Sequence, residues 1–220
     1  MGEMVSYPAN GHTTTGYLAT RGSGTGPGLL VIQEWWGLVD HIKTVADRLA
    51  AAGFVALAPD FYAGETTQSP DAAAKLFMAL NIDRAGADLR GSADYLLSRS
   101  DVTSMKVGAL GFCMGGQLAL YAGMTDPSHI GCAVDFYGIH PNVPIDPARV
   151  KVPVLGKNRL RGQSGRRAVR APLLRGRSCL LQRTRPQVYN PEAARLAWER
   201  TLGFLRLHLG SDETELGAVG

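Results

Sequence analysis

The feature that most constrains this chain is the segment 105–123, which reads MKVGALGFCMGGQLALYAG. An apolar run from Val107 to Leu110 leads into a turn of small residues, Gly111 to Gly116, and apolar residues at helical spacing follow. This order predicts a buried strand, a sharp turn and a helix. Cys113 lies in the turn with a glycine two positions away on either side, where a larger side chain would collide with the neighbouring strand or helix.

The pattern G-x-C-x-G at such a turn is the nucleophile elbow of an α/β-hydrolase, with cysteine in place of serine. The turn lifts the sulfur to the edge of the sheet and places it at a helix N-terminus, where the helix dipole and free N–H groups favour a thiolate. We therefore interpret Cys113 as a catalytic nucleophile. The alternative is a buried, inert cysteine in a glycine-rich turn.

Apolar runs and helical periodicity alternate along the rest of the sequence. This alternation predicts a three-layer α/β fold with a mostly parallel central sheet and the active site at the carboxyl ends of its strands. Together with the elbow it indicates an α/β-hydrolase fold. A length of 220 residues fits a single domain over 1–220. The expected strands are 5–7, 16–19, 28–33, 54–58, 105–110, 131–136 and 152–155, and the expected helices are 39–52, 70–80, 81–99, 117–124 and 190–209.

The formal net charge of +4 comes from one segment. Ten basic residues and no acidic one lie between Lys157 and Pro186, whereas the remainder has thirteen basic and nineteen acidic residues. The segment contains no aromatic residue that could stack on a base, so we expect no nucleic-acid partner.

Several absences in the sequence bear on compartment and ligands. The three cysteines form no spaced framework, no signal-peptide order is present, and no apolar run approaches the roughly 18 residues of a membrane span. No His, Cys or Asp cluster has the spacing of metal ligands. We expect a cytoplasmic monomer without metal, cofactor or membrane contact.

Six motifs carry a resemblance to a known family. They are LLVIQEWWGL at 29–38, RLAAAGFVALAPDFYAG at 48–64, GFCMGG at 111–116, DFYG at 135–138, VPVL at 152–155 and VYNPEAARLAWERTLGFLRLHL at 188–209. Together they resemble the dienelactone hydrolase family of α/β-hydrolases, in order and spacing up to Leu155 and again from about Thr184. The resemblance implies a cofactor-free hydrolase of carboxylic esters or lactones, similar to carboxymethylenebutenolidase.

The resemblance also implies roles for individual residues. Cys113 matches the nucleophile, and Glu34 matches an acid that hydrogen-bonds the resting thiol and lets the bound substrate control its ionisation. The backbone N–H groups of Trp35 and Met114 match the oxyanion hole. Tyr137 matches a residue that lines the substrate pocket.

Two of these assignments have alternatives. Trp36 is a second candidate for substrate binding, although exposed aromatic packing fits it equally well. For Glu34 the alternative is a solvated loop residue.

Family members that open dienelactone hold the substrate carboxylate with arginines. One such arginine precedes the helix that corresponds to 70–80, and this chain has none there. The second follows the catalytic histidine and cannot be placed in this sequence. An unidentified ester or lactone is therefore the expected small-molecule substrate.

The family's triad requires an aspartate after the strand at 152–155 and a histidine before the last helix. Between Gly156 and Glu192 the sequence contains neither residue. The triad is thus incomplete as written.

The segment at about 156–184, with its Arg-rich core at 157–183, resembles translation in a wrong reading frame. Residues 178–183, Ser-Cys-Leu-Leu-Gln-Arg, can be encoded TCA TGC CTT CTT CAA CGA. A shift by one base gives His-Ala-Phe-Phe-Asn, the family's motif around its catalytic histidine. Residues 175–177 in the same frame admit Gly-Ala-Asp. We therefore hypothesise a frame disruption, from the gene or from sequencing.

The competing hypothesis is a binding protein that has lost hydrolysis, or a degenerate gene product. The nearby substitutes for the catalytic histidine are His41, His129 and His140. His140 follows a strand end and is the least implausible of them, but a surface histidine is the favoured interpretation.

Overall fold

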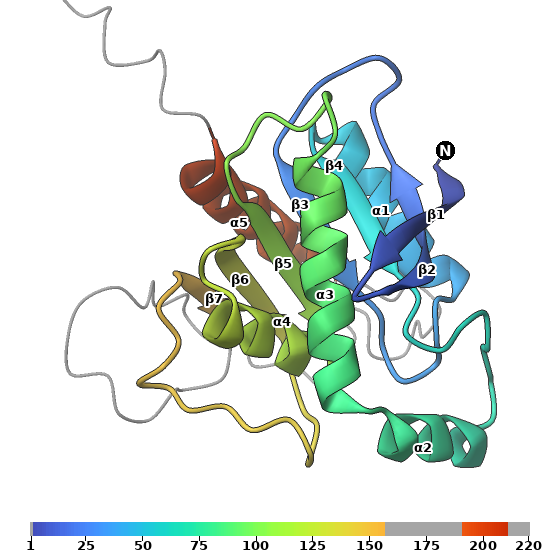
Figure 1. Cartoon of the computed structure of the whole chain (residues 1–220). Helices are drawn as coiled ribbons and strands as arrows, with labels where there is room; N and C mark the ends of the chain where they lie inside the picture. Colours follow the sequence, from blue (N-terminus) through green and yellow to red (C-terminus); the bar gives the residue numbers. More distant parts are fainter. Residues whose placement is uncertain (1, 157–190, 211–220) are drawn as a thin grey trace, which may run out of the picture.

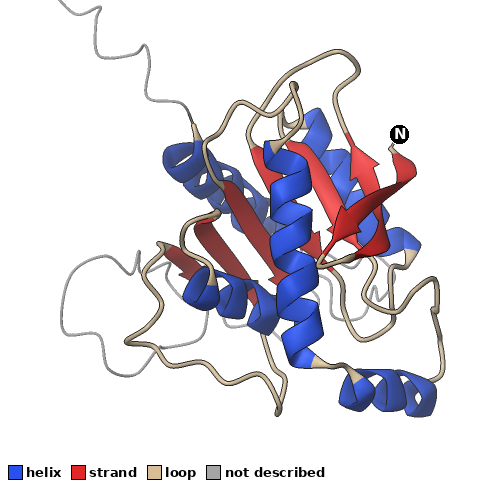
Figure 2. Ribbon diagram, viewed as in Figure 1, coloured by secondary structure: helices blue, strands red, loops and turns tan. Residues whose placement is uncertain are grey.

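The computed structural model describes residues 2–156 and 191–210, and these build a seven-stranded sheet with helices on both faces (Figures 1 and 2). The predicted three-layer α/β-hydrolase architecture is confirmed. The strands are β1 (Glu3–Ala9), β2 (His12–Ala19), β3 (Gly28–Ile32), β4 (Val55–Pro59), β5 (Val107–Phe112), β6 (Ile130–Phe136) and β7 (Val154–Gly156). The helices are α1 (Asp40–Ala51), α2 (Pro70–Ala79), α3 (Ile82–Leu97), α4 (Met114–Thr125) and α5 (Pro191–Leu209).

The strand order is β1-β2-β4-β3-β5-β6-β7. The pairs from β4 through β7 are parallel, whereas β1 and β2 form an antiparallel hairpin that joins the edge of β4. Asn10 and Gly11 form the turn that closes this hairpin, and both have positive φ, as a two-residue hairpin turn of this type requires. Strand β5 lies inside the parallel part, so its carboxyl end has neighbours on both sides.

Each face of the sheet packs on its own pair of helices. Along β3, Leu29 and Val31 pack with α1 and α5, whereas the alternate residues Leu30 and Ile32 pack with α3 and α4. Figure 2 shows α3 and α4 in front of the sheet and α1 and α5 behind it. Burial on both faces explains the continuous apolar runs in the parallel strands.

The predicted boundaries are close to the observed ones, with two informative differences. Met105 is 94% exposed and β5 begins only at Val107. Helix α4 begins at Met114, three residues earlier than predicted, because the two glycines of the elbow are already helical and buried. Side chains cap two of the helices: Ser69 accepts a hydrogen bond from Ala72 N at the start of α2, and Asn81 accepts one from Arg84 N at the start of α3.

The Arg-rich stretch 157–183 and most of the proposed frame disruption lie outside the described residues. Within the described ranges, no helix has both the length and the hydropathy needed to cross a bilayer.

Candidate active site

Cys113 occupies a tight turn between β5 and α4. Its backbone has φ 53° and ψ −122°, a conformation that costs a non-glycine residue free energy and persists only where the surroundings enforce it. Backbone hydrogen bonds supply that enforcement, because Cys113 N donates to Phe136 O at 3.0 Å and Cys113 O accepts from Gly116 N at 3.0 Å. The side chain is half-buried.

The glycines of the elbow permit a close approach of backbones, as predicted. A Cβ atom added at Gly111 would collide with the backbone of Gly115, and one added at Gly115 would collide with the carbonyl oxygens of Ile32 and Gln33. Helix α4 therefore sits directly against the ends of β3 and β5. This contact fixes the nucleophile's position at the carboxyl edge of the sheet.

The surroundings of Cys113 favour the neutral thiol over the thiolate. Burial raises its pKa above the ordinary value, the charge of Glu34 raises it further, and a hydrogen bond from the Met114 backbone N–H lowers it only in part. The Met114 N–H at the helix N-terminus favours the thiolate, as expected, but desolvation of the charged form outweighs this effect.

Glu34 lies directly beyond the end of β3 and is 5% exposed. Its Oε1 accepts a hydrogen bond from the Tyr137 hydroxyl at 3.3 Å, and its backbone pairs with Gly37. The alternative of a solvated loop residue is thus wrong. The structure brings Glu34 and Tyr137 together with Cys113, which interacts with the Glu34 charge.

The two tryptophans after Glu34 are half-buried and pack on each other, with ring centroids 4.9 Å apart. Trp35 also contacts Phe77 of α2 edge to face, at 6.4 Å. These contacts anchor the loop that carries the Trp35 N–H, one of the two predicted oxyanion donors. The other donor, Met114 N–H, already points at the sulfur.

Tyr62 is a site residue that the sequence analysis missed. It lies in the loop after β4, and its hydroxyl donates to Met114 Sδ at 3.4 Å. Burial and the charge of an ionised Cys113 both raise the pKa of its phenol. One feature of the sequence could have identified Tyr62. Pro59-Asp60 ends a parallel strand, so the loop that follows lies at the same edge of the sheet as Glu34 and Cys113.

His140 is 3% exposed, so its interpretation as a surface histidine is wrong. Its Nδ1 accepts from Asn142 N at 3.1 Å and its Nε2 donates to Phe77 O at 2.9 Å. Burial lowers the pKa of the ring, which agrees with this neutral tautomer. Both nitrogens are engaged, so His140 has none left to take a proton from the thiol.

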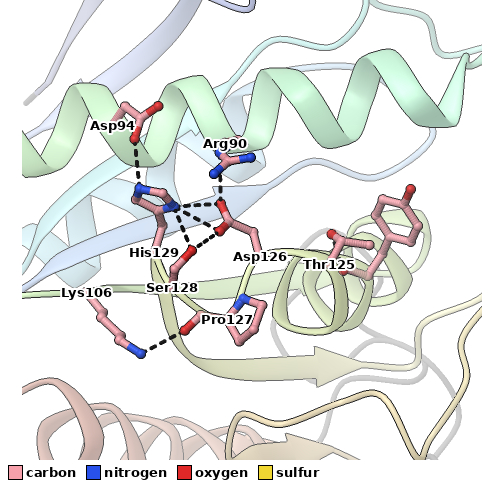
Figure 3. Close-up of polar contacts among 9 residues, drawn as sticks. Arg90, Asp94, Lys106, Thr125, Asp126, Pro127, Ser128 and His129 are labelled. Atoms are coloured by element: carbon pink, nitrogen blue, oxygen red, sulfur yellow. Dashed lines mark hydrogen bonds and ion pairs between the residues drawn. The ribbon is translucent and has the colours of Figure 1, made fainter.

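His129 lies at the opposite edge of the sheet, just before β6. Figure 3 shows it between two carboxylates, with Nδ1 2.8 Å from Asp126 Oδ1 and Nε2 3.2 Å from Asp94 Oδ1. His41, on the first turn of α1, packs on Phe112 with ring centroids 6.1 Å apart. Its Nε2 has no hydrogen-bond partner among the described residues.

The described ranges contain no group of three or more His, Cys, Asp or Glu side chains arranged to hold a metal ion. The arrangement at the elbow suits covalent chemistry instead. It presents one thiol, the backbone N–H of Met114 beside it and a buried carboxylate that opposes its ionisation.

Comparisons with known proteins agree with this geometry. The model of the "Dienelactone hydrolase family" matches residues 14–162. A relative from Aquifex aeolicus, "Putative carboxymethylenebutenolidase", is 32% identical and the match covers 95% of this chain and 100% of that protein. "Protein usf" from Aquifex pyrophilus is 42% identical over 70% of this chain and 69% of its own length.

Among solved structures, a dienelactone-hydrolase-like promiscuous phosphotriesterase from metagenomic libraries has the same fold. Its TM-score is 0.70 at 23% identity, over 96% of this chain and 99% of that one. The fold, the elbow at its centre and the family match over most of the chain lead to one conclusion. The chain belongs to the dienelactone hydrolase family and is a hydrolase by that membership.

Proposed function

We propose that this protein hydrolyses a carboxylic ester or lactone through an acyl-enzyme on Cys113. The observation that carries the proposal is the elbow itself. Cys113 is held at positive φ between β5 and α4, half-exposed, with the Met114 N–H at its sulfur. A strained backbone at a nucleophile is typical of catalytic turns.

In the proposed reaction the Cys113 sulfur attacks the substrate carbonyl carbon. The carbonyl oxygen gains the negative charge and is stabilised by the N–H groups of Trp35 and Met114. Collapse of this intermediate breaks the C–O bond, and the thiol proton leaves with the alcohol. Water then hydrolyses the thioester, which releases the acid and restores the thiol.

Glu34 keeps the nucleophile protonated until substrate arrives. The burial of Cys113 and the charge of Glu34 both raise the pKa of the thiol and so oppose the thiolate in the empty site. A substrate that displaces or neutralises the carboxylate would allow the thiol to ionise. Tyr137, which donates to Glu34, and Trp36 are the residues that we propose to contact the substrate.

The reaction still needs a group that takes the thiol proton and activates water. The sequence between Gly156 and Glu192 has no histidine or aspartate, and His140 has no free ring nitrogen. We therefore propose that the polypeptide as written is acylated at Cys113 but turns over very slowly.

The frame hypothesis makes a separate, direct prediction. A peptide map by mass spectrometry of the protein from its source, over 150–189, is expected to contain His-Ala-Phe-Phe-Asn. Peptides with the written Ser-Cys-Leu-Leu at 178–181 would refute a sequencing error and leave a truly incomplete triad, either through a frame disruption in the gene or in a binding protein that has lost hydrolysis.

The substrate class rests on two considerations. A relative from Bradyrhizobium carries the name "Probable 2-oxo-3-(5-oxofuran-2-ylidene)propanoate lactonase" and is 30% identical over 96% of this chain. No arginine precedes α2, where members that open dienelactone bind a carboxylate. We therefore propose an ester or lactone other than dienelactone.

The test is intact-protein mass spectrometry with p-nitrophenyl acetate. We expect a single acetyl adduct at Cys113, together with p-nitrophenol release that stops after about one equivalent. Cys113→Ala is expected to abolish the adduct. Cys132→Ala is the matched control, because burial raises the pKa of that thiol to about 12 and leaves it unreactive. Absence of an adduct at Cys113 would overturn the proposal.

A second candidate is a binding protein that retains the pocket without hydrolysis. The fully engaged ring of His140 favours it. Labelling of Cys113 by iodoacetamide, without ester acylation, would support binding over hydrolysis.

A further inference from the structure

A cavity of about 460 Å³ lies at the same edge of the sheet as Cys113, between the start of β2, the loop after β4 and the junction of α2 with α3. This volume falls within the range of small-molecule sites. Its polar lining consists of His12, Thr13, Thr14, Thr15, Asp60, Asn81, Arg84 and Asp88, and its apolar lining is centred on Phe61, Tyr62, Leu76 and Leu80.

Tyr62 lies between this cavity and the residue that follows the nucleophile. The side chain lines the cavity, while its hydroxyl reaches Met114 Sδ at 3.4 Å, in the residue that follows Cys113. The loop is fixed by Asp60, whose two carboxylate oxygens accept from Tyr62 N at 3.0 Å and Gly64 N at 2.6 Å. The cavity is lined by no residue of the elbow itself, so an acyl chain on Cys113 would have to pass Tyr62 to reach this space.

The charged residues of the lining are already paired. Asp88 is 7% exposed and lies 3.1 Å from His12 Nε2 and 3.8 Å from Arg84 Nε, while Asp60 is used by the loop backbone. A bound anion would face two carboxylates, and a bound cation would face Arg84. The lining thus disfavours a charged occupant and suits a neutral one.

The remaining lining groups form hydrogen bonds or pack on carbon. Threonine hydroxyls come from β2, and Thr14 faces α3 because it pairs with the buried Tyr7. Phe61 and Leu80 offer apolar surface to a carbon chain. We propose that the cavity is a second substrate subsite, which binds a neutral, hydroxyl-bearing acyl group attached to the carbonyl at Cys113; this rests on the proposed function.

The test compares acylation of Cys113 by the p-nitrophenyl esters of hexanoic acid and 6-hydroxyhexanoic acid, followed by intact-protein mass spectrometry. We expect the hydroxylated ester to react about three- to tenfold faster, the range expected for one or two hydrogen bonds. Thr14→Val removes a hydroxyl at nearly constant shape and is expected to reduce this preference.

A second variant tests the proposal by filling the cavity with a larger side chain. Ala79→Phe places a ring at the cavity from the exposed end of α2 and is expected to abolish the preference. Ala51→Phe is the matched control, since Ala51 is the exposed last residue of α1 and does not line the cavity.

The outcomes separate this inference from the function it rests on. Equal rates with the two esters, or a preference that survives Ala79→Phe, would overturn the subsite while leaving acylation of Cys113 in place. Failure of both esters to acylate Cys113 would overturn the proposed function and the subsite together.

Discussion

Tyr137 donates a hydrogen bond to Glu34 across the end of the strand that carries the nucleophile, with 3.3 Å between the hydroxyl and Oε1. Glu34 follows β3 and Tyr137 follows β6, and β5 lies between these two strands. Tyr137 has a positive φ of 48°, so its backbone is strained to hold this position. The bond therefore fixes a buried carboxylate beside Cys113.

The charge of Glu34 should control the reactivity of Cys113. We expect Glu34→Gln to lower the pKa of the Cys113 thiol, because one of the two causes that raise it is removed while the Met114 N–H remains. At pH 7.5 a larger fraction is then thiolate, so alkylation by iodoacetamide accelerates several-fold. The measurement is the rate of alkylation against pH, whose midpoint moves to lower pH.

Glu199→Gln provides the control for this experiment, since Glu199 lies on α5 and pairs with Arg195. It is expected to leave the pH profile of Cys113 unchanged. A Glu34→Gln profile identical to that of the original protein would show that the carboxylate does not govern the thiol.

The backbone of this site could be predicted from the sequence because parallel strands end at one edge. Glu34, Cys113 and Tyr137 each follow an apolar run, and that position alone places them together. The ionisation of Cys113 could not be predicted in the same way. It depends on how deeply the turn is buried, and burial at one atom is a property of packing rather than of sequence pattern.

Tyr62 was not predicted as a site residue and His140 was predicted at the surface, and both errors have the same physical cause. Tyr62 lies in a loop of no periodicity, and Asp60 folds that loop onto Met114 through two backbone hydrogen bonds. His140 precedes a turn that begins with Pro141 and Asn142, yet its ring packs on Phe77 with 4.2 Å between the ring centroids. Such contacts between distant segments carry no local sequence signal.

Two glycines with different surroundings, Gly111 in the elbow and Gly203 on α5, are expected to respond in opposite ways to substitution by alanine. Gly111→Ala is expected to destabilise the fold by more than about 2 kcal/mol, because its Cβ collides with the backbone of Gly115 and no side-chain movement relieves it. Gly203→Ala, on the exposed face of α5 with no atom within 4 Å of the new Cβ, is expected to stabilise by about 0.5–1 kcal/mol. Urea unfolding measures both, and equal effects would contradict the close approach.

The cluster around Asp126 predicts a loss of stability in acid. Burial raises the pKa of this carboxyl, but hydrogen bonds from Ser128 and His129 and the charge of Arg90 lower it more, so the net shift is downward (Figure 3). A folded-state pKa below the unfolded value gives stability that is present above about pH 4 and lost as the pH falls. Asp126→Asn is expected to cost about 1 kcal/mol at pH 7 and much less at pH 3.

Urea unfolding at the two pH values checks this difference. Glu3→Gln, which removes an exposed carboxylate from β1, should leave both values nearly unchanged. A constant penalty for Asp126→Asn at pH 7 and pH 3 would mean that the contacts of Asp126 do not depend on its charge.

The buried histidines predict a second pH dependence, at higher pH. Burial lowers the pKa of His41 and of His140, and the charge of Arg48 lowers that of His41 further. Below the unfolded value of about 6.5, the unfolded chain binds protons that the folded chain excludes. Stability is therefore complete above this pH and is lost as the pH falls toward the lowered folded-state values.

Replacement of His41 isolates one of these contributions. His41→Phe is expected to raise the free energy of unfolding by about 1 kcal/mol at pH 7.5, because it removes a buried nitrogen that has no hydrogen-bond partner among the described residues. The gain should grow at pH 5, because protonation of the imidazole favours the unfolded chain when the folded-state pKa is lowered. Urea unfolding at pH 7.5, 6.0 and 5.0 tests this, and a gain that stays constant over the three values would show that His41 does not titrate between the folded and unfolded states.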